Sequence, residues 1–465
     1  MGKSEMYLFT STVVSLLLLM LLIDIGLVSF LILLISVNSF LFIAYKQIVS
    51  NAYNKTLVVT VFFLFILLGT LLIFWINNVA INKGTEAIPY LPGDGLSYFL
   101  LAKEITDGTK VTDISLNYAG YPLVLSALFK VFGPYLIFGL LLNLFLLAAN
   151  ILLVAKSAFL IYEDKRIFDL SIFILLGISQ FLATGFMLLK DGFIVLSITL
   201  AFFAGAKYIK KGSLKSSACL LTISLVTMGL FRSTLIFAPV IIFLLFALEK
   251  RKNKLQLLVM LTPVIMIAVA VSGKYALSER SLDDSLEFAA SNTIISGRLE
   301  NNAGVISAVL SGYDNWGVAK KAAFLPITGA IQYITPFDVY NIKPVMDFPY
   351  YLISKNYQIV WLVYLGPLFI FSIVFSLKNK RLFTGLQLRI LSLAIILCMI
   401  PAFIYGGAIP RYAVPFIPLF VPSMAQVFVH INNNKLVKTN WSHFLLYMYI
   451  SFLFLFALYV VFKIL

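Results

Sequence analysis

The chain has 465 residues, of which 61% are hydrophobic and only 12% are charged, and its formal net charge is +15. A water-soluble domain does not have so few charges, and the apolar runs are long enough to cross a bilayer. The composition therefore excludes a soluble enzyme or binding module and predicts an all-α polytopic membrane protein.

The apolar runs predict about 13 transmembrane helices along the chain. The expected spans are 7–23, 26–44, 57–76, 135–155, 167–188, 192–207, 216–231, 233–248, 255–272, 357–376, 389–405, 412–430 and 443–462. The first span is followed almost at once by the second, so we expect it to be retained and not cleaved as a signal peptide. An odd number of spans places the two termini on opposite sides of the membrane.

The position of the basic residues favours a cytoplasmic N-terminus. With this orientation the basic runs 207–215, 249–254 and 378–381 all face the cytoplasm, which is the positive-inside pattern. These residues orient the spans and contact lipid headgroups, so the net charge does not indicate a nucleic-acid partner. Together with the lack of an organellar signal, this predicts a multi-pass protein of the bacterial plasma (inner) membrane.

The predicted topology divides the chain into four parts. An N-terminal transmembrane hairpin (1–56) precedes a membrane core (57–272) that includes a first outer loop at 77–134. A second large outer loop (273–356) precedes the C-terminal transmembrane helices (357–465). Both extracytoplasmic loops alternate turn residues with apolar stretches, which is typical of helices that lie in the membrane interface.

The first outer loop contains an acidic residue, Asp94, between two glycines, which predicts an exposed turn at the membrane surface. Tyr98, Ala102 and Ile105 follow at helical spacing and predict a short helix that Asp107–Gly108 ends. An acidic side chain fixed at the edge of an apolar medium is costly unless it is used or paired. We therefore expect Asp94 to be the working residue of an extracytoplasmic site, although Gly-Asp-Gly is also a common turn sequence.

Further charged residues fall in very short outer turns between spans. They are Lys190, Asp191, Arg232 and Arg411. A short outer turn does not need cations for topology, and the positive-inside bias disfavours them there. The alternatives are that Lys190 snorkels beside Asp191 and that the two arginines bind lipid phosphate at span ends.

These residue types suit chemistry on a phosphate-linked substrate. Lys190, Arg232 and Arg411 would hold a phosphate or diphosphate leaving group, because a guanidinium matches phosphate oxygens with paired hydrogen bonds. A carboxylate would accept the proton of an attacking hydroxyl as a general base. The combination predicts transfer of a sugar from a lipid-linked phosphate donor to an acceptor outside the cytoplasm.

Two motifs resemble a known family. Gly93–Ile105 reads G-D-G-x-x-Y-x-x-x-A-x-x-I, and Ala119–Gly133 reads A-G-Y-P-L-x-L-x-x-L-F-x-x-F-G, followed by Asn143 in the next span. This order resembles the first outer loop of C-type (GT-C) integral-membrane glycosyltransferases of family 39 and its bacterial relatives, the protein mannosyl-, aminoarabinosyl- and lipopolysaccharide-sugar transferases. Near the C-terminus, R-Y-x-x-P-x-x-P from Arg411 to Pro418 is similar to another motif of that family.

The resemblance implies an inverting hexosyl- or pentosyltransferase that takes its sugar from a polyprenyl phosphate and acts in cell-surface polysaccharide or glycoconjugate synthesis. It implies Asp94 as the catalytic residue and a saccharide or lipid-linked glycan as acceptor. Tyr98, Tyr121 and Tyr412 would be aromatic contacts of the substrate pocket, unless they only pack. Many members have an acidic pair in this loop, whereas Gly95 follows Asp94 here, so Asp191 is the candidate second carboxylate. Two extra spans also precede the loop.

Two other functions stay open. An O-antigen or capsule polymerase or ligase would also use outer arginines and a lipid diphosphate donor. A lipid-linked oligosaccharide flippase would instead place charges through the midplane of its spans, which this sequence does not. No metal site and no cofactor are predicted, and a single divalent cation between Asp94 and a diphosphate is the one open alternative.

Overall fold

The structure is a computed structural model that describes residues 2–20, 25–83, 93–108, 116–249, 364–404 and 414–464. About 91% of the described chain is helical and none of it forms a strand, which confirms the all-α prediction. The helices before the first long gap are α1 (Lys3–Leu19), α2 (Leu27–Asn51), α3 (Lys55–Lys83), α4 (Gly93–Thr106), α5 (Leu116–Phe132), α6 (Leu136–Tyr162), α7 (Lys165–Gly177), α8 (Ser179–Phe186), α9 (Asp191–Lys211), α10 (Leu214–Arg232), η2 (Ser233–Leu235) and α11 (Phe237–Glu249). After it come α19 (Gly366–Lys378), η8 (Lys380–Leu382), α20 (Gly385–Ile404), η9 (Val414–Phe416), α22 (Ile417–Asn433) and α23 (Lys435–Ile464).

Six helices of the described chain are long and apolar enough to cross a membrane. They are α2, the first 24 residues of α3, α6, α9, α10 and the stretch Val414–Asn433. Each coincides with a predicted span, and together they make this a multi-pass membrane protein. The predicted span 255–272 and the second outer loop lie outside the described residues.

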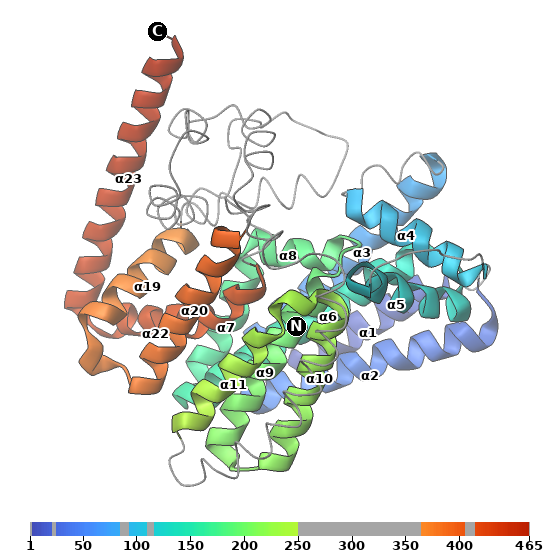
Figure 1. Ribbon diagram of the computed structural model, residues 1–465, viewed down its shortest axis with the longest axis horizontal. Helices are drawn as coiled ribbons and strands as arrows, with labels where there is room; N and C mark the ends of the chain where they lie inside the picture. The colour runs from blue at the N-terminus through green and yellow to red at the C-terminus, as the bar shows by residue number, and fades with distance from the viewer. Residues whose placement is uncertain are drawn as a thin grey trace. The chain divides into compact units, whose positions relative to one another are not determined.

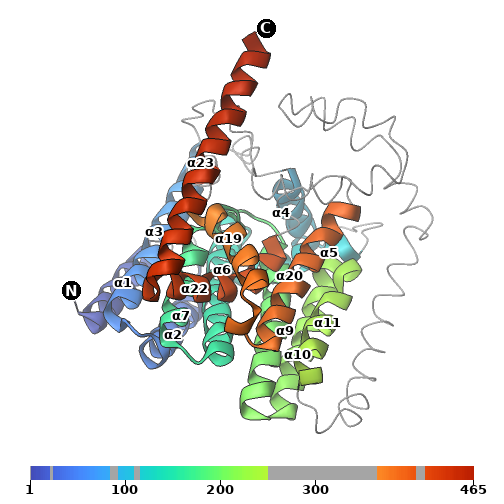
Figure 2. The ribbon, with the colours of Figure 1, turned by 90° about the vertical axis from the view of Figure 1, so that its left-hand side faces the viewer.

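The chain divides into two compact units, and the first contains α1 to α11. Helix α6 packs against α3, α7, α8 and α9, and α9 packs in turn against α10 and α11. Figures 1 and 2 show α9, α10 and α11 side by side in both views. Helix α6 is buried along most of its length, so it forms the centre of this unit.

One end of this bundle gathers the basic loops of the sequence. Lys210 near the end of α9 forms an ion pair with Glu163, which follows α6. The buried carboxylate of Asp169 on α7 accepts hydrogen bonds from the backbone N–H groups of Tyr53 (3.0 Å) and Asn54 (2.7 Å), directly before α3. The start of α9 and the last residue of α10 therefore lie at the opposite end of the bundle.

The N-terminal hairpin is held by polar side chains between α1 and α2. Asn38 of α2 accepts a hydrogen bond from the Ser11 hydroxyl and donates to the Ser15 oxygen (3.1 Å) and to the carbonyl oxygen of Leu34 (2.9 Å). Tyr7 of α1 also stacks on Tyr45 of α2.

The predicted span 167–188 is not one continuous helix. Helix α7 ends at Gly177, Ile178 has an extended backbone (φ −93°, ψ 101°), and α8 begins at Ser179. Glycine has a low helix propensity, which favours the end of α7 at Gly177. Ile178 is buried, so protein covers the break and the backbone groups freed there are not exposed to lipid.

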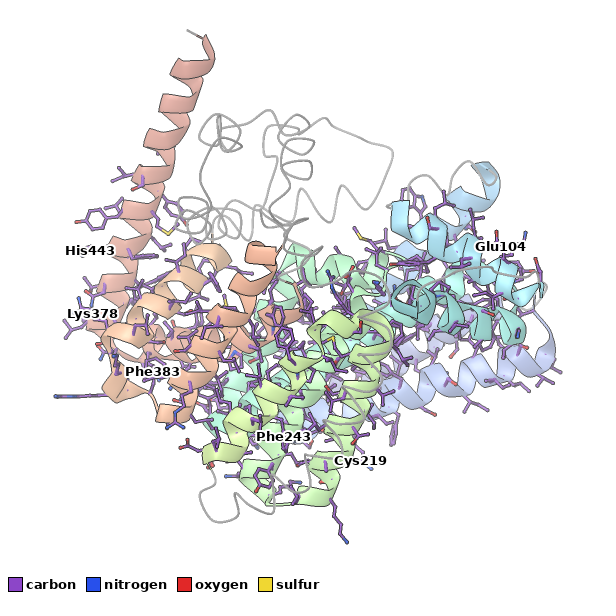
Figure 3. The ribbon with its side chains drawn as sticks, viewed as in Figure 1. Glu104, Cys219, Phe243, Lys378, Phe383 and His443 are labelled. Atoms are coloured by element: carbon purple, nitrogen blue, oxygen red, sulfur yellow. The ribbon has the colours of Figure 1, made fainter. Side chains whose placement is uncertain are left out.

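The second unit contains α19, α20, α22 and α23. Helix α22 packs against the other three. Pro418 lies in its first turn and Pro422 inside it, and most of its side chains are buried, as the sequence predicts for a proline-rich span. Trp441 of α23 packs edge-on against Phe371 of α19, with ring centroids 5.1 Å apart. Figure 3 labels Lys378 and Phe383, at the end of α19 and just after η8.

Candidate functional site

Helix α4 begins where the sequence predicts a turn. Gly93, Asp94 and Gly95 form its first turn, where an acidic residue is favoured by the helix dipole. The helix ends at Thr106, and Gly108 has the positive φ of +74° that the predicted stop requires. The side chain of Asp94 lies outside the described part of the structure.

Four aromatic rings connect α4 to the end of the bundle opposite the basic loops. Tyr98 of α4 meets Tyr121 of α5 edge-on (centroids 5.4 Å apart), and Tyr121 meets Phe193 of α9 (6.1 Å). Phe193 stacks on Phe231 of α10, with centroids 4.2 Å apart and planes 7° apart. All but Phe193 are almost fully buried. We call these residues the four-ring cluster.

Three of the predicted charged residues border the four-ring cluster. Lys190 is the N-cap residue of α9, and Asp191 is its first residue. Arg232 is the last residue of α10 and directly follows Phe231 of the cluster. Lys190 and Arg232 are half-buried, whereas Asp191 is only 1% exposed. The structure therefore brings residues that are 40 positions or more apart in sequence to one end of the bundle.

The environment of Tyr121 excludes it as a base. Burial raises the pKa of its hydroxyl far above the ordinary value, and the negative charge of Asp191 adds to this, while the Asn143 side chain beside the hydroxyl acts in the opposite direction. Helix α5, which contains Tyr121, is not among the six membrane-crossing helices. Tyr121 therefore stays neutral, packs in the cluster and cannot accept a proton at physiological pH.

Several predicted site residues are not placed. Arg411 and Tyr412 lie outside the described residues. Of the predicted site residues, the structure brings together Lys190, Asp191, Arg232, Tyr98 and Tyr121. Tyr98 and Tyr121 are buried against other rings, which agrees with the alternative that they only pack.

Sequence reasoning did not single out Phe193, Phe231 or Gly120. Phe193 lies in the first turn of α9 and Phe231 in the last turn of α10, and phenylalanine is so frequent here (42 residues) that its position is no signal by itself. Gly120, in the A-G-Y-P motif, packs directly on the backbone of α10 at Leu230. Of these three residues, only the glycine of the motif could have indicated a contact between helices, because glycine permits close backbone approach.

Within the residues whose side chains are described, no group of three or more His, Cys, Asp and Glu side chains could hold a metal ion. Lys190 and Arg232 lie at the same end of the bundle as Asp191, and cations of these types can bind an anion and polarise a bond to a phosphate. Comparison with family models, with curated proteins and with solved structures finds no match to this chain.

Proposed function

We propose that the protein is an extracytoplasmic glycosyltransferase that uses a polyprenyl-phosphate-linked sugar. The observation that supports this most is the stacking of Phe193 on Phe231, because it joins the chain segments that contain Lys190, Asp191 and Arg232. Helix α4, which begins with Asp94 in its first turn, is connected to the same place through Tyr98 and Tyr121.

In the proposed reaction, the carboxylate of Asp94 takes the proton of an acceptor hydroxyl. The oxygen attacks the anomeric carbon of the donor sugar, and the bond between that carbon and the phosphate oxygen breaks. The phosphate leaves with the electron pair of that bond, still attached to its lipid. Lys190 and Arg232 would neutralise the charge that develops on it, which is where such cations act in phosphate chemistry.

A lipid-linked substrate is compatible with the position of this protein in a membrane. A polyprenyl tail is apolar and can remain between lipid and the exposed apolar faces of the helices, while its phosphate reaches the polar end of the bundle. The basic loops around Glu163 and Lys210 lie at the other end. This separation fits a cytoplasmic basic face and an extracytoplasmic site.

The test is Asp94→Asn in the full-length protein, reconstituted with lipid-linked donors. We expect transfer to fall by a factor of about 10² to 10⁴, the usual contribution of a general base. Asp107→Asn is the matched control, because Asp107 is an exposed carboxylate just after the same helix. Full activity of the Asp94→Asn variant would refute the proposal.

The same reconstituted system separates the alternatives. Addition of one sugar per acceptor supports the transferase, and transfer of a whole repeat unit would indicate a polymerase or ligase. Movement of the lipid-linked substrate across the membrane without a new glycosidic bond would indicate a flippase.

A further inference from the structure

The turn between α8 and α9 has a backbone that is not helical although it is buried. Helix α8 ends at Phe186, and Met187 is extended (φ −114°, ψ 148°). Met187, Leu188 and Leu189 are each at most 6% exposed. Carbonyl groups of such a buried turn need hydrogen-bond partners, because no water or lipid atom replaces them.

The backbone N–H of Leu189 donates to the carbonyl oxygen of Met187 (2.9 Å), and Asn143 of α6 supplies a further donor to the turn. Its Nδ2 atom donates to the carbonyl oxygen of Met187 and to that of Leu189, the latter at 3.2 Å. The side chain is fully buried, so water does not compete for these bonds. One amide therefore holds the carbonyls on both sides of Leu188, directly before Lys190.

Gly139 lies four residues before Asn143 on the same face of α6, and it leaves space for the turn between α8 and α9. A Cβ atom at Gly139 would stand 2.3 Å from Cδ1 of Leu188 and 2.9 Å from Cδ2 of Leu125. Both distances are far shorter than normal van der Waals contact, so a side chain at residue 139 would force Leu188 and Leu125 to move. Gly139 and Asn143 together form a seat on α6 for the turn, which we call the α6 seat.

We propose that Asn143 is a positioning residue that fixes the turn so that Lys190 meets the phosphate of the lipid-linked donor. The identity of the ligand rests on the proposed function, whereas the fixing of the turn does not. Asn143 does not touch the reacting atoms in this proposal. It also lies beside the hydroxyl of Tyr121, so the α6 seat borders the four-ring cluster.

The first experiment measures how accessible position 190 in the turn is to a labelling reagent, and it does not depend on enzyme activity. Lys190→Cys is introduced into a full-length protein that has Cys219→Ser and Cys398→Ser, and its labelling by a charged maleimide is timed. Cys219 lies near the start of α10, at the end of that helix away from Arg232 (Figure 3). With Asn143→Ala added, we expect labelling to become about tenfold faster, because the carbonyl of Leu189 loses its side-chain donor and the carbonyl of Met187 keeps only the backbone N–H of Leu189.

Ser224→Ala is the matched control. Its hydroxyl is equally buried and donates to the carbonyl oxygen of Ser197 (2.6 Å), which joins α10 to α9 farther along the bundle. An unchanged labelling rate with Asn143→Ala, or an equal change with Ser224→Ala, would overturn the positioning role.

A second pair of variants covers the case in which Asn143→Ala does not fold. Gly139→Ala displaces Leu188 but keeps the amide of Asn143, and we expect it to accelerate labelling as well. Gly205→Ala adds a comparable clash, 2.4 Å from Cδ2 of Phe246 between α9 and α11, and should leave the rate at position 190 unchanged. Equal rates for the two glycine variants would contradict the proposal.

The second experiment uses the reconstituted transfer reaction. We expect Asn143→Ala and Lys190→Ala each to raise the KM for the donor about tenfold with little change in kcat, and the double variant to equal Lys190→Ala alone. If the two substitutions instead raised the KM independently, so that their factors multiplied in the double variant, Asn143 would not act through Lys190. If the unaltered protein shows no transfer from any lipid-linked sugar, the proposed function fails, while the labelling rates still decide whether Asn143 fixes the turn.

Discussion

Gly120 of α5 lies so close to α10 that a Cβ atom on it would stand 2.1 Å from the carbonyl oxygen of Leu230. This contact is between two backbones, so neither side can move away by changing a rotamer. It attaches α5 to the turn of α10 that precedes Phe231 and Arg232. The position of α5, and with it Tyr121, therefore depends on the absence of a side chain at residue 120.

We predict that Gly120→Ala destabilises the protein by about 1–3 kcal/mol, the usual cost of overpacking a tight contact. The measurement is the midpoint of thermal unfolding in one detergent. Gly26→Ala is the control, because no atom lies within 4 Å of a Cβ there. Equal midpoints for the two variants would show that α5 does not depend on this contact.

A second prediction concerns Arg232. Arg232→Gln should raise the KM for the lipid-linked donor about 10- to 100-fold, because a charge-assisted hydrogen bond to phosphate is lost. Arg232→Lys should recover only part of this, since an ammonium group cannot form the paired bonds of a guanidinium. Steady-state kinetics with Lys130→Gln, an exposed cation in the last turn of α5, provide the comparison. A normal donor KM for Arg232→Gln would remove this residue from the site.

A third prediction tests the buried carboxylate at the other end of the bundle. Asp169→Asn replaces one acceptor oxygen with an NH₂ group that faces a backbone N–H of Tyr53 or Asn54. We expect a loss of about 1–3 kcal/mol in stability, the cost of an unsatisfied buried donor. Asp164→Asn should cost much less, because Asn is also a good N-cap and the ion pair of Asp164 with Arg166 is solvent-exposed. The unfolding midpoints of the two variants decide this.

A fourth prediction concerns pH. Partial burial works to raise the pKa of Asp164, but hydrogen bonds from the side chain and the backbone N–H of Arg166 outweigh it, and the pKa lies below its ordinary value. The ionised carboxylate therefore contributes stability above its unfolded pKa, and this contribution disappears as the pH falls through the folded pKa. The difference in unfolding midpoint between the unaltered protein and Asp164→Ala should be constant near neutral pH and shrink below about pH 4. A difference that grows in acid would contradict it.

The sequence predicts some parts of this fold well because their signals are local. The residues Asp107–Gly108 predict the end of α4, and Gly108 has the positive φ that this requires. Long apolar runs predict the six membrane-crossing helices. Asn117 and Pro122 are residue types that favour turns, yet both lie inside α5, which begins at Leu116 and continues through Pro122. A proline near the start of a helix removes few hydrogen bonds, so a turn signal alone could not decide this case.

The site could be predicted only in part. Charges in short outer turns pointed to Lys190, Asp191 and Arg232, which do lie at one end of the bundle. The break at Ile178 and the roles of Gly139 and Gly120 depend on which helices touch, and hydropathy has no information about contacts between helices. The placement of Asp94 relative to Arg411 stays a prediction.

The polar contacts of Asn38 bear on the order in which the chain is assembled. Asn38, Ser11 and Ser15 satisfy one another inside the first two helices and need no later segment. A polar side chain alone in hydrocarbon is costly, whereas a matched set is tolerated. The N-terminal pair can therefore enter the bilayer as a closed unit during synthesis, before α6 has left the ribosome, and then act as the surface on which the later helices dock.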